Sequence, residues 1–176
     1  RVEGNLGMIW LAKADYRQAN VCFSLVVAGT QSESWEHVLS IVTARRGLAE
    51  VYLAQEQYNE AWHQANEAEN LAEGRKLMLS LAETSLTKAH IAELDPSTPG
   101  AATYFRDQGR QKLREYGNPI ILARTLMSEA RYQCQRGNRG EATDLALEAR
   151  DHFVKLAMDI EVQISEEFII EMYENR

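Results

Sequence analysis

Four histidines are the residues of this chain whose type is best suited to metal binding or acid–base catalysis. They are scattered at His37, His63, His90 and His152, and no His-Glu-x-x-His sequence joins any two of them. The stretch "HQANE" places His63 and Glu67 on one helical face, where such a pair usually forms a surface hydrogen bond. The sequence also has no glycine-rich phosphate loop and no Gly-x-Ser-x-Gly elbow. We therefore expect no enzyme, no cofactor and no metal site.

Charge and cysteine spacing exclude further classes of protein. Cys22 and Cys134 are 112 residues apart without a second pair, so we expect two reduced, buried thiols in a cytoplasmic protein. The net charge of −7 disfavours direct contact with nucleic acid or an anionic membrane, and no apolar run approaches the roughly 20 residues that span a bilayer. We accordingly interpret Trp35 and Trp62 as packing residues rather than as a base-stacking platform.

Helix-breaking residues divide the chain into helices of about 12 to 21 residues, with no credible strand. Gly29 is predicted to end one helix with a positive φ. The following "TQSE" (30–33) has the pattern of a capping box, which predicts a helix from near Ser34 to about Gln55.

Two X-Pro pairs predict further helix starts. Thr98 and Asn118 are expected to cap helices whose first residues are Pro99 and Pro119. The last helix, roughly 159–174, is predicted to bury one apolar face, and it either caps the molecule or opens another repeat. The apolar positions at steps of four are Ile160, Ile164, Phe168 and Met172.

Small residues recur at a nearly fixed spacing, which indicates a repeat. One series follows at intervals of 42, 40 and 41 residues: Ala19, Ala61, Ala101 and Ala142. Twelve residues before each of these lie Gly7, Ala49, Ala89 and Ala130, and four residues after each lie Phe23, Ala65, Phe105 and Ala146. Small residues at such positions let two antiparallel helices pack within about 8–10 Å. The prediction is an all-α chain of stacked helical hairpins.

These residues carry a resemblance to tetratricopeptide (TPR) repeats. The first copy matches through "LG" (6–7), Trp10, "DY" (15–16), Ala19 and Phe23, and the second through "GLAEVYLAQEQYNEA" (47–61). The match is strong to about residue 75 and weak after it. The resemblance implies an α-solenoid, one domain of repeats at 1–30, 31–74, 75–117 and 118–157 with a terminal helix at 158–176.

The repeats are about seven residues longer than the usual TPR. Long repeats of this kind resemble the sensor regions of maltose-regulator-type transcription activators and of signalling NTPases. The chain begins "RVEGNLGMIW", without an initiator Met, and we expect a fragment of such a larger regulator.

In TPR-like arrays the first helix of each pair lines a concave groove. Transferred by register, the groove residues would be Met8, Leu11, Arg46, Glu50, Leu53, Leu86, His90, Arg124, Met127 and Arg131. The three arginines would suit an acidic peptide, or would instead be solvated or paired with local carboxylates such as Glu50. The carboxylate clamp of chaperone-binding TPR domains is absent, because its positions hold Gly4, Met8, Gly47, Glu83 and Thr87.

The resemblance thus implies a non-catalytic module that binds a protein or peptide. Two alternatives remain at this point: a superhelix that encloses a small metabolite, and a segment through which the parent protein self-associates. A stripe of arginines at 106, 110 and 114, with Lys112 nearby, is interpreted as the solvated outer face of a second helix, and a patch for acidic partners is the less common alternative.

Overall fold

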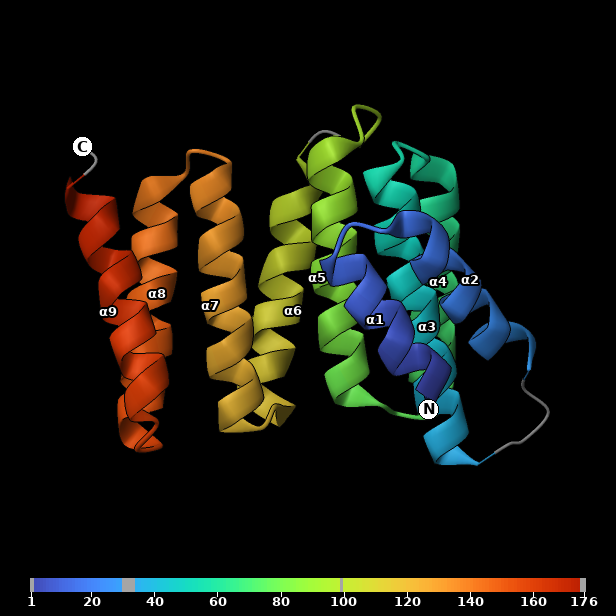
Figure 1. Cartoon of the computed structure of the whole chain (residues 1–176), viewed down its shortest axis with the longest axis horizontal. Helices are drawn as coiled ribbons and strands as arrows, with labels where there is room; N and C mark the ends of the chain where they lie inside the picture. The colour runs from blue at the N-terminus through green and yellow to red at the C-terminus, as the bar shows by residue number, and fades with distance from the viewer. Residues whose placement is uncertain (1, 30–33, 99, 175–176) are drawn as a thin grey trace. The chain divides into compact units, whose positions relative to one another are not determined.

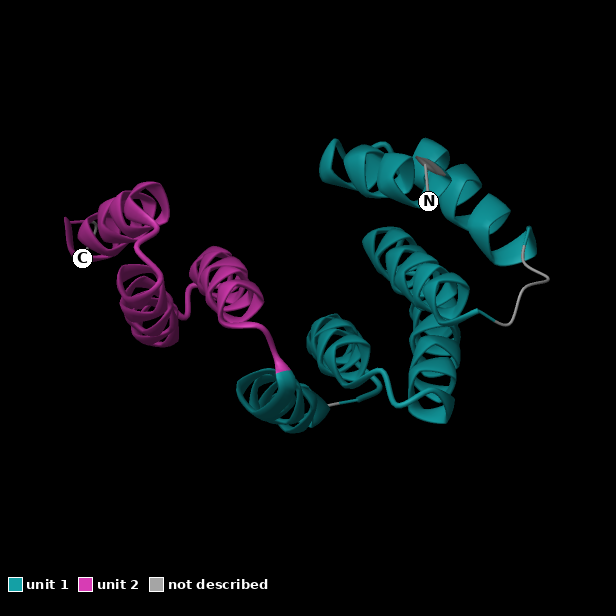
Figure 2. Cartoon of the chain, turned by 90° about the horizontal axis from the view of Figure 1, so that it is seen from below, with its two compact units in different colours: residues 1–116 teal, residues 117–176 magenta. Residues whose placement is uncertain are grey.

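The computed structural model describes residues 2–29, 34–98 and 100–174, and these residues form nine α-helices and no strand (Figure 1). The predicted all-α class is therefore confirmed. The chain divides into two compact units, Arg1–Tyr116 and Gly117–Arg176, coloured separately in Figure 2.

Each unit is built from helices that pack against their neighbours along the chain. The first unit contains α1 (Val2–Ala12), α2 (Tyr16–Ala28), α3 (Trp35–Ala54), α4 (Tyr58–Gly74), α5 (Met78–Leu94) and α6 (Ala101–Tyr116). The second contains α7 (Pro119–Gln135), α8 (Arg139–Lys155) and α9 (Asp159–Glu174). In the first unit, α1, α3 and α5 also contact one another in that order, which is the consecutive stacking of an α-solenoid.

Tight turns with one residue in the left-handed region end five of the helices. At the end of α3, Glu56 (φ 59°) donates its N–H to the Leu53 carbonyl, and the Gln57 N–H reaches the Tyr52 carbonyl. This pair of hydrogen bonds is a Schellman motif. The same pair recurs with a positive φ at Ala14, Lys76, Gly137 and Ala157. Glu56 and Gly137 are 81 residues apart, as are Lys76 and Ala157, so the turns follow the repeat.

The boundaries of two helices agree with the prediction from the sequence, and those of others differ. Ser34 precedes α3, which ends at Ala54, close to the predicted bounds; the capping box at 30–33 lies outside the described residues. The Asn118 side chain accepts from the Ile120 N–H at 2.9 Å and caps α7, which begins at Pro119 as predicted. Gly29, however, has φ −76° and not the positive φ that we expected.

The predicted Thr98 cap is wrong. Its hydroxyl donates to the Asp95 carbonyl at 3.3 Å instead of accepting from the start of α6, which begins at Ala101. The expected first residue of that helix, Pro99, lies outside the described residues.

Small residues do lie where the helices cross. Side chains that are at most 1% exposed include Ala19, Ala49, Ala61, Ala65, Ala89, Ala130, Ala142 and Ala146. The Phe23 ring is fully buried and lies against Gly7 of α1 and Gly47 of α3. A Cβ built on Gly7 would be 2.5 Å from Phe23 Cε1, so the absence of a side chain there makes room for the ring. The same close approach applies at Gly47.

In the third hairpin the predicted register is wrong by one residue. Helix α6 buries Ala102, Arg106, Gly109 and Leu113, which is the spacing of Ala61, Ala65, Ala68 and Ala72 in α4. Ala101 and Phe105, the expected packing residues, are only half-buried. A Cβ on Gly109 would be 2.9 Å from the Ala82 carbonyl oxygen, so α5 and α6 approach closely there.

Arg106 is therefore buried and does not belong to a solvated stripe. Its guanidinium pairs with Glu93 of α5, and the two side chains are 7% and 12% exposed. This ion pair takes the place of the small-residue contact that Ala65 provides in the preceding hairpin.

The apolar face of α9 also differs from the prediction. The buried residues are Ser165, Ile169 and Met172, whereas Ile160 and Ile164 are 73% and 40% exposed. Steps of four drift around a helix of 3.6 residues per turn, so this series leaves the buried face at its N-terminal end.

Candidate binding groove

A groove of about 550 Å³ opens on the side of the first unit where α1, α3 and α5 lie next to one another. The residues that line it are Met8, Leu11, Tyr16, Thr43, Arg46, Gly47, Glu50, Ala54, Glu83, Thr87 and His90.

Helical spacing explains why these side chains share one surface. On α3 the lining positions are 43, 46, 47, 50 and 54, and on α5 they are 83, 87 and 90. Residues three, four and seven apart lie on one face of a helix. The opposite face of α3 carries Leu48 and Val51, which are buried against α1 and α2 in one core cluster. Gly47, which is buried against Phe23, lies where the groove face meets this core.

Two charged contacts cross the groove from α3 to α5. The Arg46 guanidinium donates through Nη1 to Glu83 Oε2, and these side chains are 22% and 31% exposed. The Glu50 carboxylate faces His90, with 3.9 Å between Oε1 and Nδ1. That separation exceeds a hydrogen bond, so the second contact is the weaker one.

The polar groups of the groove are not fully satisfied by the protein. The Nε of Arg46 is buried and has no hydrogen-bond acceptor in the described part of the chain. Thr43, by contrast, donates its hydroxyl to the Leu39 carbonyl at 2.9 Å and is occupied locally. With histidine counted as neutral, the lining carries two carboxylates and one guanidinium.

The end of the groove nearest α1 is apolar. Met8 is 47% exposed, while Leu11 and Tyr16 are half-buried. A thioether side chain is flexible and polarisable, and it can adjust to apolar groups of different shapes. The groove therefore offers an adaptable apolar contact beside a charged one.

The structure brings together five of the residues that register assigned to a groove: Met8, Leu11, Arg46, Glu50 and His90. Leu53 and Leu86 do not line it. Leu53 is 7% exposed and packs in a core cluster with Ala49, Ala61, Ala65 and Ile91. Leu86 is 8% exposed and lies against Gly109 of α6. Both positions face the second helices, and Ala54 lines the groove in place of Leu53.

The three groove residues that were predicted on α7 lie in the second unit. Arg124 pairs with Glu161 of α9 at 3.1 Å, Met127 is 5% exposed, and Arg131 is exposed. Met127 is therefore a core residue of that unit. A convergence of Arg46, Arg124 and Arg131 on one ligand stays a prediction.

Glu83 and Thr87 were noted in the sequence only as positions where the chaperone clamp is absent, and the contact of Glu83 with Arg46 was not predicted. Thr87 stands 41 residues after Arg46, which is one repeat, and Glu83 precedes Thr87 by one helical turn. An acidic residue at that place, opposite an arginine of the preceding repeat, is the signal that could have indicated the ion pair.

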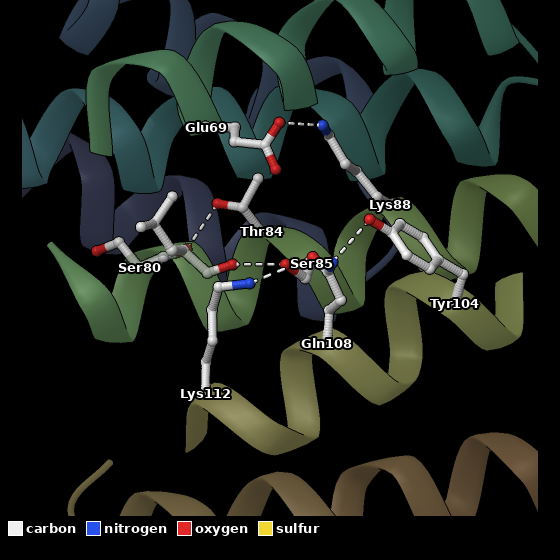
Figure 3. A network of polar contacts seen from close by, with 9 residues as sticks. Glu69, Ser80, Thr84, Ser85, Lys88, Tyr104, Gln108 and Lys112 are labelled. Carbon is white, nitrogen blue, oxygen red and sulfur yellow. Dashed lines mark hydrogen bonds and ion pairs between the residues drawn. The ribbon is translucent and has the colours of Figure 1, made fainter. Parts of the chain in front are cut away.

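A second cluster of polar side chains lies around α5 (Figure 3), but its groups satisfy one another. Lys88 is 5% exposed, pairs with Glu69 of α4, and lies 5.6 Å from the centroid of the Phe105 ring. Thr84 and Ser85 donate to the carbonyls of Ser80 and Leu81, at 2.7 and 2.9 Å.

On α6, the Gln108 amide links Lys112 to the Tyr104 hydroxyl. These bonds, like those of Thr84 and Ser85, lie within single helices, and Lys88 is the member of the cluster shown to connect α5 with both α4 and α6.

Asp95 forms another structural contact, between α4 and the loop before α6. Its carboxylate accepts hydrogen bonds from the Ser97 hydroxyl at 2.7 Å, the Ser97 N–H at 2.9 Å, and Trp62 Nε1 at 2.9 Å. The bonds from Ser97, and then that from Trp62, lower the pKa of Asp95 although burial opposes them. Trp62 also packs against Phe105, with ring centroids 5.6 Å apart, as a packing residue should. Trp35 is 59% exposed and does not pack in this way.

The residues that the structure describes contain no group of three or more His, Cys, Asp or Glu side chains placed to hold a metal ion. Cys22 and Cys134 are free thiols, but they are half-buried and not fully buried as predicted. None of the described helices combines the length and apolar character needed to cross a membrane.

Comparison of the chain with protein-family models, with curated proteins and with solved structures finds no match.

Proposed function

We propose that this chain is a non-catalytic, TPR-like helical-repeat module that binds a protein or peptide segment in the groove between α1, α3 and α5. The observation that carries the proposal is the groove itself, which is lined by side chains from three consecutive first helices. Met8 and the three charged side chains Arg46, Glu50 and Glu83 stay partly exposed, so the lining combines apolar contact with charged groups. In a larger protein, such a module would serve as the sensor or interaction region of a signalling or transcription regulator.

The dimensions favour an extended segment. Neighbouring helices in such packing are about 8–10 Å apart, so three of them span roughly 16–20 Å. An extended chain covers about 3.3 Å per residue, and roughly five or six residues would therefore cross the groove. A segment of this length can contact the apolar end at Met8 and the charged middle at Glu50 together.

A small-molecule ligand is the second candidate, and the volume of the groove supports it. About 550 Å³ lies within the range of roughly 300–1,000 Å³ that is common for small-ligand sites. Such sites are mostly apolar, however, whereas the middle of this groove is charged. The peptide is therefore the first choice.

A selection of displayed random peptides on the immobilised chain tests the proposal. The dissociation constants of the selected peptides would be measured by fluorescence anisotropy for the original chain and for Glu50→Trp, which fills the middle of the groove. We expect at least a roughly tenfold weaker affinity for this variant. The indole ring would exclude the peptide from the middle of the groove, and the loss of one strong contact costs more than about 1.4 kcal/mol of binding free energy.

The matched control is Glu60→Trp, the same substitution at an exposed position of α4 outside the groove. It should leave the affinity unchanged. Equal weakening by both substitutions, or by neither, would place the peptide elsewhere and contradict the proposal.

A further inference from the structure

We infer that the segment bound in this groove presents a lysine or arginine side chain to Glu50 and Glu83, beside an apolar side chain that contacts Met8 and Leu11. This inference rests on the proposed function and specifies the partner's chemistry. It differs from the acidic segment that the resemblance of the sequence suggested.

Glu50 is the carboxylate most available to a partner. In the described part of the chain its ionic contact is with His90, at 3.9 Å, and the Glu50 side chain is 32% exposed. A carboxylate can accept about four hydrogen bonds through its two oxygens. The Glu50 carboxylate could therefore accept several hydrogen bonds from a cation that entered the groove.

Glu83 supplies the second acceptor without losing its present partner. Arg46 bonds to its Oε2, which leaves Oε1 for a second cation. Both carboxylates lie on the same groove lining, on adjacent helices. Charge-assisted hydrogen bonds of this kind are about twice as strong as neutral ones.

An acidic partner would meet the opposite situation. The guanidinium of Arg46 is paired with Glu83 through Nη1, and its Nε, unpaired in the described part of the chain, is buried, so an incoming carboxylate would have to displace Glu83 or share the arginine with it. Displacement would leave a partly buried carboxylate unpaired, which is unfavourable. The lining has one carboxylate more than it has guanidinium groups, and the chain carries a net charge of −7. The excess negative charge of the lining and the negative net charge of the chain both attract a cation at longer range.

The apolar end of the groove sets the position of the neighbouring residue. Met8, Leu11 and Tyr16 line the groove together with Glu50. The methylene stem of lysine or arginine packs on apolar surface while its charged end reaches a carboxylate. A basic residue next to an apolar one therefore matches the arrangement of the groove.

Two synthetic peptide pools test this inference directly. Both contain random apolar and small residues, and they differ in one central residue, which is lysine in the first pool and glutamate in the second. The fraction of each pool retained by the immobilised full chain is measured at low and at moderate salt, for the original chain, for Glu50→Gln and for Glu50→Trp. Glu60→Gln, which makes the same charge change at an exposed position outside the groove, is the control.

We expect the original chain to retain the lysine pool at least about fivefold better than the glutamate pool. Glu50→Gln should remove most of this preference, and Glu60→Gln should keep it. Because Glu50 is partly exposed, its replacement leaves the core intact, and unchanged circular dichroism would verify the fold.

The other outcomes separate this inference from the proposed function. If both pools are retained equally, or the glutamate pool is preferred, and Glu50→Trp still abolishes retention, the groove binds peptides and the inference about charge is overturned. A lysine preference that survives Glu50→Gln also overturns it. If neither pool is retained, both the inference and the peptide-binding function are contradicted.

Discussion

Arg46 and Glu50 lie one turn apart on α3, yet each faces a different residue of α5. Arg46 is held by Glu83, whereas Glu50 faces His90 at 3.9 Å. This difference sets the electrostatic character of the groove, because Arg46 is already paired with a carboxylate through Nη1 whereas the Glu50 carboxylate stays accessible. Two side chains away from the groove, Asp95 and Glu56, lead to predictions about the free energy of unfolding.

Asp95 should make the free energy of unfolding depend on acid. Its pKa is lowered in the folded protein, chiefly by the hydrogen bonds from Ser97. A carboxyl group with a depressed pKa stabilises the fold above its unfolded pKa of about 4, and this contribution is lost as pH falls through the lower folded pKa. Urea unfolding at several pH values should therefore show a shallower acid loss for Asp95→Asn than for the original chain.

Asp151→Asn provides the comparison. The pKa of Asp151 is also lowered, by its hydrogen bond with Arg150, but this carboxylate is exposed and salt screens its ionic interaction. The effect of Asp95→Asn should persist in salt while that of Asp151→Asn fades. An identical acid profile for Asp95→Asn and the original chain would contradict the assignment.

The left-handed turn residues give a second prediction. A residue with a side chain loses roughly 1–2 kcal/mol in this conformation, whereas glycine does not. Glu56→Gly should raise the free energy of unfolding by about 0.5–1 kcal/mol after the greater freedom of glycine in the unfolded chain is included. Gly137→Ala, the reverse change in the equivalent turn, should lower it by about 1 kcal/mol. Thermal or urea unfolding measures both, and a stability loss in Glu56→Gly would count against the turn geometry.

At the scale of the element, one aromatic ring lies at the centre of the core between the first two hairpins. Phe23 of α2 enters the space left by Gly7 and Gly47, on α1 and α3. Glycine within a helix is unfavourable by about 1 kcal/mol relative to alanine, so its presence in two helices that face one ring indicates a steric requirement.

Gly47→Ala should therefore destabilise the protein although it improves helix propensity. Overpacking of a filled core typically costs about 1–3 kcal/mol. The gain in helix propensity from glycine to alanine is about 1 kcal/mol, so the net effect should be a lower free energy of unfolding. Gly74→Ala is the control, because a Cβ at Gly74 meets no atom within 4 Å. If Gly47→Ala unfolds at a higher urea concentration than the original chain, the Phe23 packing described here is wrong.

The third hairpin depends on the buried pair Arg106 and Glu93. Glu93→Leu would leave the guanidinium of Arg106 buried without this carboxylate, and removal of one member of a buried pair typically costs about 3–5 kcal/mol. The double variant Glu93→Leu with Arg106→Leu should recover much of that loss, since neither charge then remains buried. A double-mutant cycle by urea unfolding measures the coupling, and purely additive losses would contradict a direct pair.

At the scale of the whole molecule, the sequence predicts the helices and most of the crossings. Small residues at a fixed spacing identify the hairpins because only short side chains permit close helices, as at Ala49 and Ala61. The sequence does not show whether Ala101 or Ala102 lies at the crossing of the third hairpin, since both are alanines and the repeat spacing fits either. Burial of Arg106 was likewise unpredictable, because an arginine is usually exposed and Glu93 becomes its partner only in the folded hairpin.

The groove was predictable to a similar extent. Register places Met8, Arg46 and Glu50 on one face, because first helices repeat their orientation. It does not supply the contacts between helices, which decide that Arg46 pairs with Glu83 and that Leu53 turns into the core. Partner chemistry therefore follows from the folded arrangement and not from the number of arginines.

The most direct test of the central claim is a methionine-methyl NMR titration of the full chain with a peptide selected from the lysine pool. The chain has five methionines, of which Met8 lines the groove, while Met127 and Met172 are buried in the second unit. Binding in the groove predicts a saturable shift of the Met8 methyl signal with little change at Met127 and Met172. A saturable shift at Met127 or Met172 without any change at Met8 would contradict it.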